Sequence, residues 1–203
     1  MLTVITSATS RLLTTVPAAR DLLGLGDEVD EIYLRDLIAQ ASAAIVSHCR
    51  RPFARETVRE TFRPRASAPL ILSRAPVLGA ATVTLDGAVL DASVLDLDPE
   101  SGLLHRVDGL GLRTCWSGYG AAVEYTAGWL LPGQDGRDLP ADVEQACLTI
   151  VAARHAGRGR DPMQRSRSVE GVGSSSWIAT ADMGALPPQA TDLLAPYRRF
   201  VAG

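Results

Sequence analysis

Few side chains in this sequence have the types and spacing that catalysis or metal binding requires. The histidines, His48, His105 and His155, are widely separated, and His48 and its neighbour Cys49 would point in different directions on a helix. The CxxC, HExxH, GxGxxG and phosphate-loop patterns are absent from the sequence. The paired carboxylates fall at turns and helix starts, where capping accounts for them. We therefore expect no catalytic residue, no metal site and no cofactor, and a protein that is not an enzyme.

The segment best suited to binding is residues 158–177, RGRDPMQRSRSVEGVGSSSW, which has no apolar periodicity. Its arginines lie among glycine and serine and could neutralise phosphates without reading a base sequence: Arg158, Arg160, Arg165 and Arg167. Asp161 and Glu170 dilute that charge. Three interpretations stay open for this segment: a linker, a segment that orders on a protein partner, and a DNA-binding arm.

The net charge and the aromatic residues near the C-terminus favour a protein partner over nucleic acid. The formal net charge is −3, so no global field attracts the chain to nucleic acid or to an anionic membrane. Trp177, Tyr197 and Phe200 lie outside any core pattern and close to arginine, as interface anchors often do. All 20 cationic residues are arginine, the better residue for bidentate and stacked contacts.

The composition indicates a soluble protein made in the cytoplasm. With 203 residues, 46% of them hydrophobic, the chain can form one globular domain, or one domain with an insertion. Its three cysteines fit a reducing compartment, and we expect Cys49 and Cys147 to be core residues. The N-terminus lacks signal-peptide features, and no apolar run approaches the ~20 residues that span a bilayer. We expect no membrane contact.

Helical patterns occupy both ends of the chain. Residues 15–24 predict a short helix that Thr15 or Val16 caps and Gly24 ends, and residues 27–49 a longer one capped by Asp27. Residues 139–157 predict a third helix with Pro140 at its first position, and a short helix is expected around residues 191–194. Apolar stripes on the second and third helices should pack together: Leu34, Leu37, Ile38, Ala41, Ala44, Ile45 and His48 with Val143, Ala146, Cys147, Ile150 and Val151.

Strand patterns fill the middle of the chain. Residues 81–90 predict a hairpin, because Asp86 and Gly87 separate two apolar runs. Further strands are expected at residues 56–63, 69–72, 94–106 with a turn at 99–102, and 121–129. The fold class is therefore α+β: a small helical bundle with an inserted antiparallel β unit and an extended C-terminal arm. We expect residues 1–55 and 130–156 in the helical core, 56–129 in the β-rich insertion, and 157–203 in a flexible arm and docking segment.

The order of several motifs resembles that of one protein family. The motifs are TVPAARDLLGL (15–25), RPF (51–53), RAPVLGAATVTLDG (74–87), DPESGLLHR (98–106), VEYTAGW (123–129), LPADVEQACLTIVAARHAGRGRD (139–161), SVEGVGSSSW (168–177) and LLAPYRRF (193–200). Their order and spacing resemble the head–tail connector (adaptor) family of tailed phages, prophages and gene transfer agents. The resemblance covers nearly the whole chain.

The resemblance implies a structural role in the neck of a particle assembled in the host cytoplasm. Family members form a homo-oligomeric ring of roughly a dozen copies below the portal protein, extend the DNA channel and dock tail or stopper proteins, so DNA passes close by without specific binding. It also implies that the C-terminal part docks on the portal, through Arg165, Arg167, Trp177, Leu193, Leu194, Tyr197, Arg198, Arg199 and Phe200. The alternatives are a nucleic-acid-binding module that uses the arginine-rich arm and, with no residues in its favour, a small enzyme.

Overall fold

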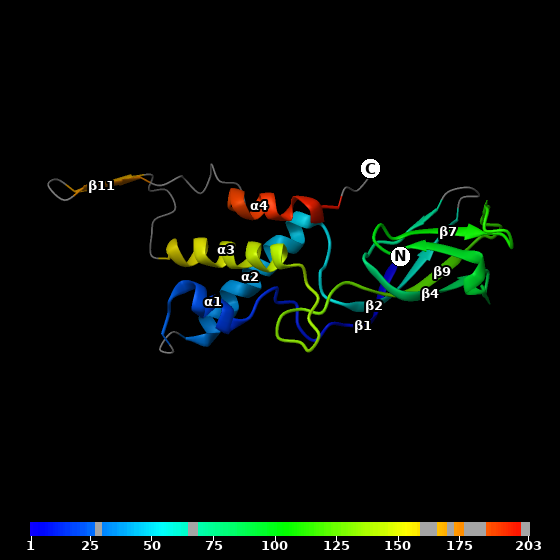
Figure 1. Ribbon diagram of the computed structural model, residues 1–203, viewed down its shortest axis with the longest axis horizontal. Coiled ribbons are helices and arrows are strands. Elements are labelled where there is room, and N and C mark those ends of the chain that lie inside the picture. The colour runs from blue at the N-terminus through cyan, green and yellow to red at the C-terminus, as the bar shows by residue number, and fades with distance from the viewer. Residues whose placement is uncertain (27–29, 65–68, 159–165, 170–172, 177–185, 200–203) are drawn as a thin grey trace. The chain divides into compact units, whose positions relative to one another are not determined.

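The computed structural model describes residues 1–26, 30–64, 69–158, 166–169, 173–176 and 186–199 (Figure 1). Within them the chain combines helices with antiparallel strands, which confirms the expected α+β class. The chain divides into two compact units: a β-rich unit, Met1–Ser10 with Pro52–Leu130, and a helical unit, Arg11–Arg51 with Leu131–Gly203. The division differs from the expected one at the N-terminus, because a first strand pairs residues 2–6 with the sheet rather than with the helices.

The helical unit begins with a helix whose two ends the sequence predicts well. Helix α1 spans Val16–Leu23, and the Ala18 N–H donates to the Thr15 hydroxyl at 3.3 Å. Gly24 closes the helix in the left-handed conformation, with φ of 62°. This conformation strains residues that carry a Cβ, so glycine is the residue expected there. The predicted cap and stop of this helix are both confirmed.

Helix α2 starts later than the sequence suggested. It spans Glu31–Cys49, and the Ile32 N–H donates to Oδ1 of Asp30 at 2.9 Å, so Asp30 rather than Asp27 is the cap. Both aspartates fit a cap pattern, and only the backbone geometry chooses between them. Asp27 lies outside the described residues. The buried face also differs, because Ala44 and His48 are half-buried while Ser42 and Cys49 are buried.

Helices α2 and α3 pack together as predicted. Helix α3 spans Ala141–Ala156, and its buried residues are the predicted stripe: Val143, Ala146, Cys147, Ile150 and Val151. Pro140 stands one position before the helix, as its N-cap, rather than at its first position. Ser42 sits between the helices, where its hydroxyl accepts the Leu13 N–H at 3.0 Å and lies 3.7 Å from the Cys147 sulfur.

The C-terminal part of the chain adds a helix to this unit. Helix α4 spans Pro188–Leu194 and continues into a 3₁₀ turn, η2, at Ala195–Tyr197. Leu186, Ala190 and Leu194 are buried, and α4 packs against α3 (Figure 1). The helix expected around residues 191–194 is thus present. The segment that contains it is packed on the helical unit rather than extended.

The β-rich unit holds two antiparallel sheets. The first has the order β1-β2-β9-β4-β5: β1 (Leu2–Thr6), β2 (Glu56–Phe62), β9 (Ala121–Ala127), β4 (Val77–Leu85) and β5 (Ala88–Val89). The second has the order β3-β7-β6, with β8 also on β7: β3 (Leu70–Ile71), β7 (Leu103–Val107), β6 (Leu95–Asp98) and β8 (Arg113–Thr114). A 3₁₀ turn, η1 (Ala92–Val94), precedes β6. The sequence analysis did not predict β1, an edge strand with only partly buried side chains.

Alternation along the strands gives this unit its core. Ala121, Val123, Tyr125 and Ala127 of β9 are all buried, as the period of two predicts. They pack with side chains from both sheets: Val58, Leu70, Leu72, Val77, Val83, Leu85, Leu104 and Trp116. The predicted hairpin is confirmed, since Asp86 and Gly87 both have positive φ, 48° and 90°, between β4 and β5.

The arginine-rich segment contains a hairpin that its sequence did not indicate. Strand β10 (Ser166–Val169) pairs antiparallel with β11 (Gly173–Ser176). Arg167 lies in β10, opposite Ser175. Hairpins of glycine and serine lack the apolar alternation from which strands are recognised, so the sequence carries no signal for this one.

Candidate functional site

The C-terminal segment meets the last turn of α2 at Arg199, and this junction is the candidate functional site. The backbone N–H of Arg199 donates to the carbonyl oxygen of Cys49 at 2.9 Å. That carbonyl belongs to the final turn of the helix, where carbonyl groups lack intrahelical partners. The bond joins two segments that are about 150 residues apart in the sequence.

Arginines from both segments meet at this end of the helical unit. Arg50 ends α2 in the left-handed conformation, with φ of 53°, and Arg51 follows it. The bond from Arg199 brings Arg198 and Arg199 to the same place. Cationic side chains are favourable beside the negative C-terminal end of a helix dipole. We call Arg50, Arg51, Arg198 and Arg199 the arginine cluster; Arg50 and Arg198 are exposed, and the other two are half-buried.

The field of these arginines acts on neighbouring titratable groups. Burial raises the pKa of the Cys49 thiol to about 11, and Arg51 and Arg198 oppose that rise. Burial, followed by the charge of Arg198, lowers the pKa of His48. An imidazole with a lowered pKa is neutral at pH 7, so it adds no charge to the cluster. The site therefore presents positive charge through arginine alone.

Tyr197 connects the cluster to the start of α3. Burial raises the pKa of its hydroxyl, as do the charge of Asp142 and a hydrogen bond to it, while Arg51 acts in the opposite sense. Asp142 is in the first turn of α3, where a carboxylate is favoured by the helix dipole. An exposed arginine pair beside a half-buried tyrosine can bind an acidic protein surface, or phosphate.

The structure assigns different environments to the predicted docking residues. Leu194 is buried in the helical unit, Leu193 and Tyr197 are half-buried, and Arg198 is exposed. Arg199 is tied to α2. Arg165, Trp177 and Phe200 lie outside the described residues. For Arg167, in β10, only the backbone is described. The sequence analysis missed Arg50 and Arg51, whose signal was the arginine pair directly before Pro52.

A second cluster lies where the arginine-rich segment leaves α3. The Tyr33 hydroxyl is 3.2 Å from Nδ1 of His155, and their rings are 6.0 Å apart. The guanidinium of Arg158 lies over the Tyr33 ring, 4.3 Å from its centre, in a cation–π contact. These contacts hold Arg158, two residues after the end of α3, on the surface of α2.

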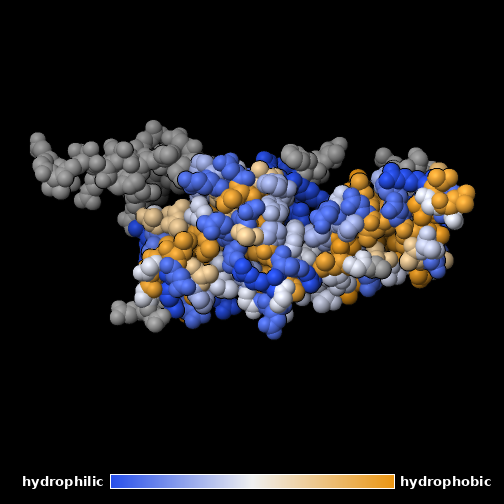
Figure 2. Space-filling view, viewed as in Figure 1, coloured by the Kyte–Doolittle hydropathy of each residue, from blue (hydrophilic) through white to orange (hydrophobic). Residues whose placement is uncertain are grey.

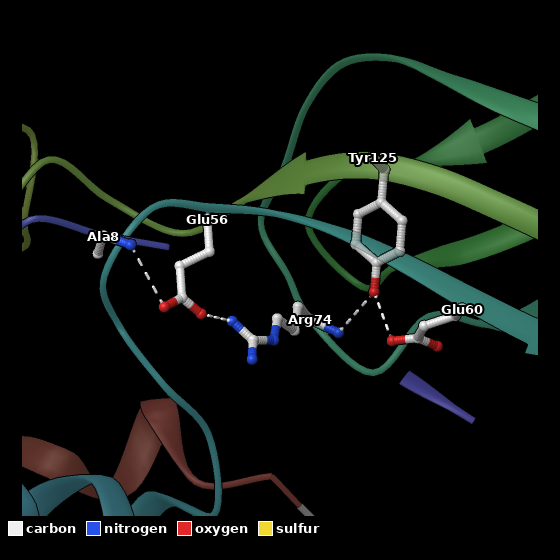
Figure 3. Close-up of polar contacts among 5 residues, drawn as sticks. All are labelled: Ala8, Glu56, Glu60, Arg74 and Tyr125. Carbon is white, nitrogen blue, oxygen red and sulfur yellow. Dashed lines mark hydrogen bonds and ion pairs between the residues drawn. The ribbon is translucent and has the colours of Figure 1, made fainter. Parts of the chain in front are cut away.

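The β-rich unit contains a buried polar network that the sequence analysis did not predict (Figure 3). Glu56 and Glu60 are each only 3% exposed. The Arg74 guanidinium pairs with Glu56, while the Tyr125 hydroxyl donates to Oε1 of Glu60 at 2.7 Å and accepts the Arg74 N–H at 3.2 Å. The N–H of Ser73 donates to both oxygens of Glu60, at 3.0 and 3.2 Å.

This network ties the loop before β4 to the sheet rather than forming a reactive site. Each carboxylate is engaged by donors, and Glu56 also accepts the Ala8 N–H at 3.4 Å. Buried charges are tolerated when they are paired and hydrogen-bonded in this way. Burial, followed by the hydrogen bond and the charge of Glu60, raises the pKa of Tyr125 well above its usual value, so this hydroxyl stays protonated. The network therefore has a structural role.

No group of three His, Cys, Asp or Glu side chains in the described ranges could hold a metal ion. Among the helices of those ranges none has the length and apolarity to cross a bilayer. Cys49 and Cys147 are buried, as the sequence predicted, and Cys115 is exposed. Burial raises the pKa of Cys147 to about 12, so it is an inert thiol.

Comparison with known proteins identifies the fold through solved structures. No family model matches the chain, and no curated protein matches it. Similar chains occur in the neck of an empty gene transfer agent particle computed with C6 symmetry (21% identity, TM-score 0.61) and in the native virion (21%, 0.58). Another occurs in the native neck computed with C12 symmetry (19%, 0.58). Each match covers 100% of this chain and 98% of the other, so the chain shares this fold along its whole length.

Proposed function

We propose that this protein is a structural component of the neck of a phage or phage-like particle, and has no catalytic activity. The observation that carries the proposal is the full-length match to chains from gene transfer agent necks, at both 100% and 98% coverage.

Within that role we propose a head–tail adaptor. Copies of the chain form a ring below the portal protein, extend the DNA channel and give tail or stopper proteins a docking surface. The C6 and C12 symmetries of the matched necks support a closed ring. A cyclic ring needs two different complementary patches on each subunit, and repeated weak contacts then hold through avidity. Particles of this kind would assemble in the host cytoplasm.

The C-terminal docking surface is proposed to include the arginine cluster. Arg50 and Arg51 join the residues expected from the sequence, because Arg199 is bonded to the last turn of α2. Leu194 is excluded from direct contact in this conformation, since its side chain is buried in the helical unit. The portal surface that binds here would carry acidic residues, which steer association and fix its register.

Affinity capture of the tagged full chain from particle-producing cells tests this function, with half of the eluate treated with nuclease. Recovery of portal and tail proteins after nuclease treatment is the expected result. Recovery of nucleic acid alone, or loss of all partners with nuclease, would overturn the neck assignment. It would instead favour a nucleic-acid-binding module, for which the arginine cluster is the structural argument.

A charge reversal tests the docking surface itself. Arg198→Glu should lower the recovery of portal protein roughly tenfold or more, because attraction to an acidic surface becomes repulsion. Arg35→Glu is the matched control, since Arg35 is an exposed arginine on α2 and makes the same change in charge. Equal portal recovery from the two variants would remove the cluster from the docking surface.

A further inference from the structure

Two strand edges of the β-rich unit are open. Strand β9 pairs along one side of β4, and β5 covers the other side only at Thr84 and Leu85. In the part of the chain that the structure describes, β6 pairs with β7 alone and is also an edge strand. Edge strands present N–H and C=O groups that can pair with a further strand. The open edge of β4 belongs to the first sheet and the edge of β6 to the second.

An apolar groove lies between these two edges. Its volume is about 390 Å³, and residues of β4, η1, β6, β7 and the turn after β6 line it: Val77, Leu78, Gly79, Ala81, Ala92, Leu95, Leu97, Pro99 and Leu104. Strand β4 is irregular here, with a register shift between Leu78 and Thr82 and with φ of 68° at Gly79. Because Gly79 in this bulge has no side chain, the space beside it stays open.

The length of the groove fits a short strand. At one end the Val77 N–H donates to the Pro99 carbonyl at 2.8 Å, and towards the other the Leu90 N–H donates to the Val83 carbonyl at 2.8 Å. From Val77 to Val83 a strand extends about 20 Å, at ~3.3 Å per residue. An extended segment of about five residues therefore fits between the two backbone contacts.

The chain beside the groove is acidic on its exposed face, because Asp96 and Asp98 alternate with the lining residues Leu95 and Leu97 along β6. Four exposed carboxylates flank its lining residues in the sequence: Asp91, Asp96, Asp98 and Glu100. No arginine or lysine occurs between residues 75 and 105. Apolar side chains are also common on the surface of this unit (Figure 2), where Ile71, Val89, Leu110, Leu112 and Tyr119 are exposed. A complementary occupant would therefore be extended, apolar on the face toward the groove and cationic on the opposite face.

We propose that this groove receives an extended segment of a tail-side neck protein, which adds as a strand beside β4 or β6. The segment places apolar side chains in the groove and arginine or lysine side chains beside Asp96 and Asp98, on the opposite face of β6. Strand addition of this kind takes affinity from main-chain hydrogen bonds and specificity from pockets for alternate side chains. The inference rests on the proposed function, because that function supplies a partner on the tail side.

Photo-crosslinking in assembled particles tests the proposal. A photoreactive amino acid replaces Ala92, an exposed residue that lines the groove, in the full chain. Ala43 is the matched control, an exposed alanine on α2. The expected result is a cross-linked peptide from a different neck protein, with apolar residues and at least one arginine or lysine, found from Ala92 and not from Ala43. Mass spectrometry of the cross-linked peptide identifies it.

A charge reversal completes the test. Asp96→Arg should lower the yield of the Ala92 cross-link roughly fivefold, while Asp36→Arg on α2 leaves it unchanged. A cross-link to a second copy of this chain, to a segment without cationic residues, or to no protein would overturn the proposal. In those cases recovery of portal protein in the capture experiment would still support the neck function. Absence of the chain from particles would overturn both.

Discussion

Removing one hydroxyl from the buried network of the β-rich unit should lower the stability of that unit by an amount that can be estimated. Tyr125→Phe deletes the donor to Glu60, at 2.7 Å, and the acceptor of the Arg74 N–H, at 3.2 Å. The tyrosine is 2% exposed, so water does not replace the lost partners. A hydrogen bond to a charged group contributes about 1.5–3 kcal/mol, and the N–H left without its acceptor adds to the loss.

We therefore expect Tyr125→Phe to cost about 2 kcal/mol of unfolding free energy, which for a domain of this size lowers Tm by roughly 10 °C. Trp116 and Trp129 both belong to the β-rich unit, so tryptophan fluorescence in a Trp177→Phe background follows its unfolding. Tyr119→Phe is the control, because Tyr119 is 95% exposed and should change stability by less than about 0.5 kcal/mol. Equal stability of the two variants would refute the assignment of a structural role to the network.

Two further predictions concern stability. Gly128→Ala should destabilise the β-rich unit by at least about 2 kcal/mol, because φ is +99° and a Cβ would lie 2.6 Å from the Ala54 carbonyl oxygen. Gly109→Ala is the control: a Cβ there would lie in open space, so this change should cost less than half as much. Thermal unfolding of the two variants measures the difference. Burial raises the pKa of the Cys147 thiol from 9.0 to about 12, so its contribution to stability is complete below pH 9 and is lost as the pH rises towards 12. The unfolding free energy, measured by denaturant titration at several pH values, should fall less steeply between pH 9 and 10.5 in Cys147→Ala than in the unchanged protein. An equally steep fall with pH in both proteins would contradict this.

Local patterns in the sequence predict several elements correctly, because their causes are local. Thr15 and Gly24 bound α1 through a cap and a left-handed stop. Asp86 and Gly87 specify a hairpin because both central residues need positive φ. The stripe on α3 was predicted in full, since burial of one helix face imposes its period. Where two residues satisfy the same rule, as Asp27 and Asp30 do, the pattern alone could not choose.

Contacts between distant residues could not be predicted in the same way. Glu56 and Glu60 occupy inward positions of β2, and only the approach of Arg74 and Tyr125 makes their burial tolerable. Strand β1 pairs with a strand more than 50 residues away, and its side chains are too exposed to show a clear period. The hairpin of β10 and β11 carries no apolar alternation at all.

The sequence by itself determined the α+β class, the ends of α1, the paired faces of α2 and α3, and the lack of catalytic motifs, since each follows from residues close together in the chain. Only the tertiary structure decided that Arg198 and Arg199 join Arg50 and Arg51, and that Leu194 is a core residue. It also placed an apolar groove between two strand edges. These features depend on which distant backbone groups meet, and a hydrogen bond such as that from Arg199 to Cys49 has no counterpart in local periodicity.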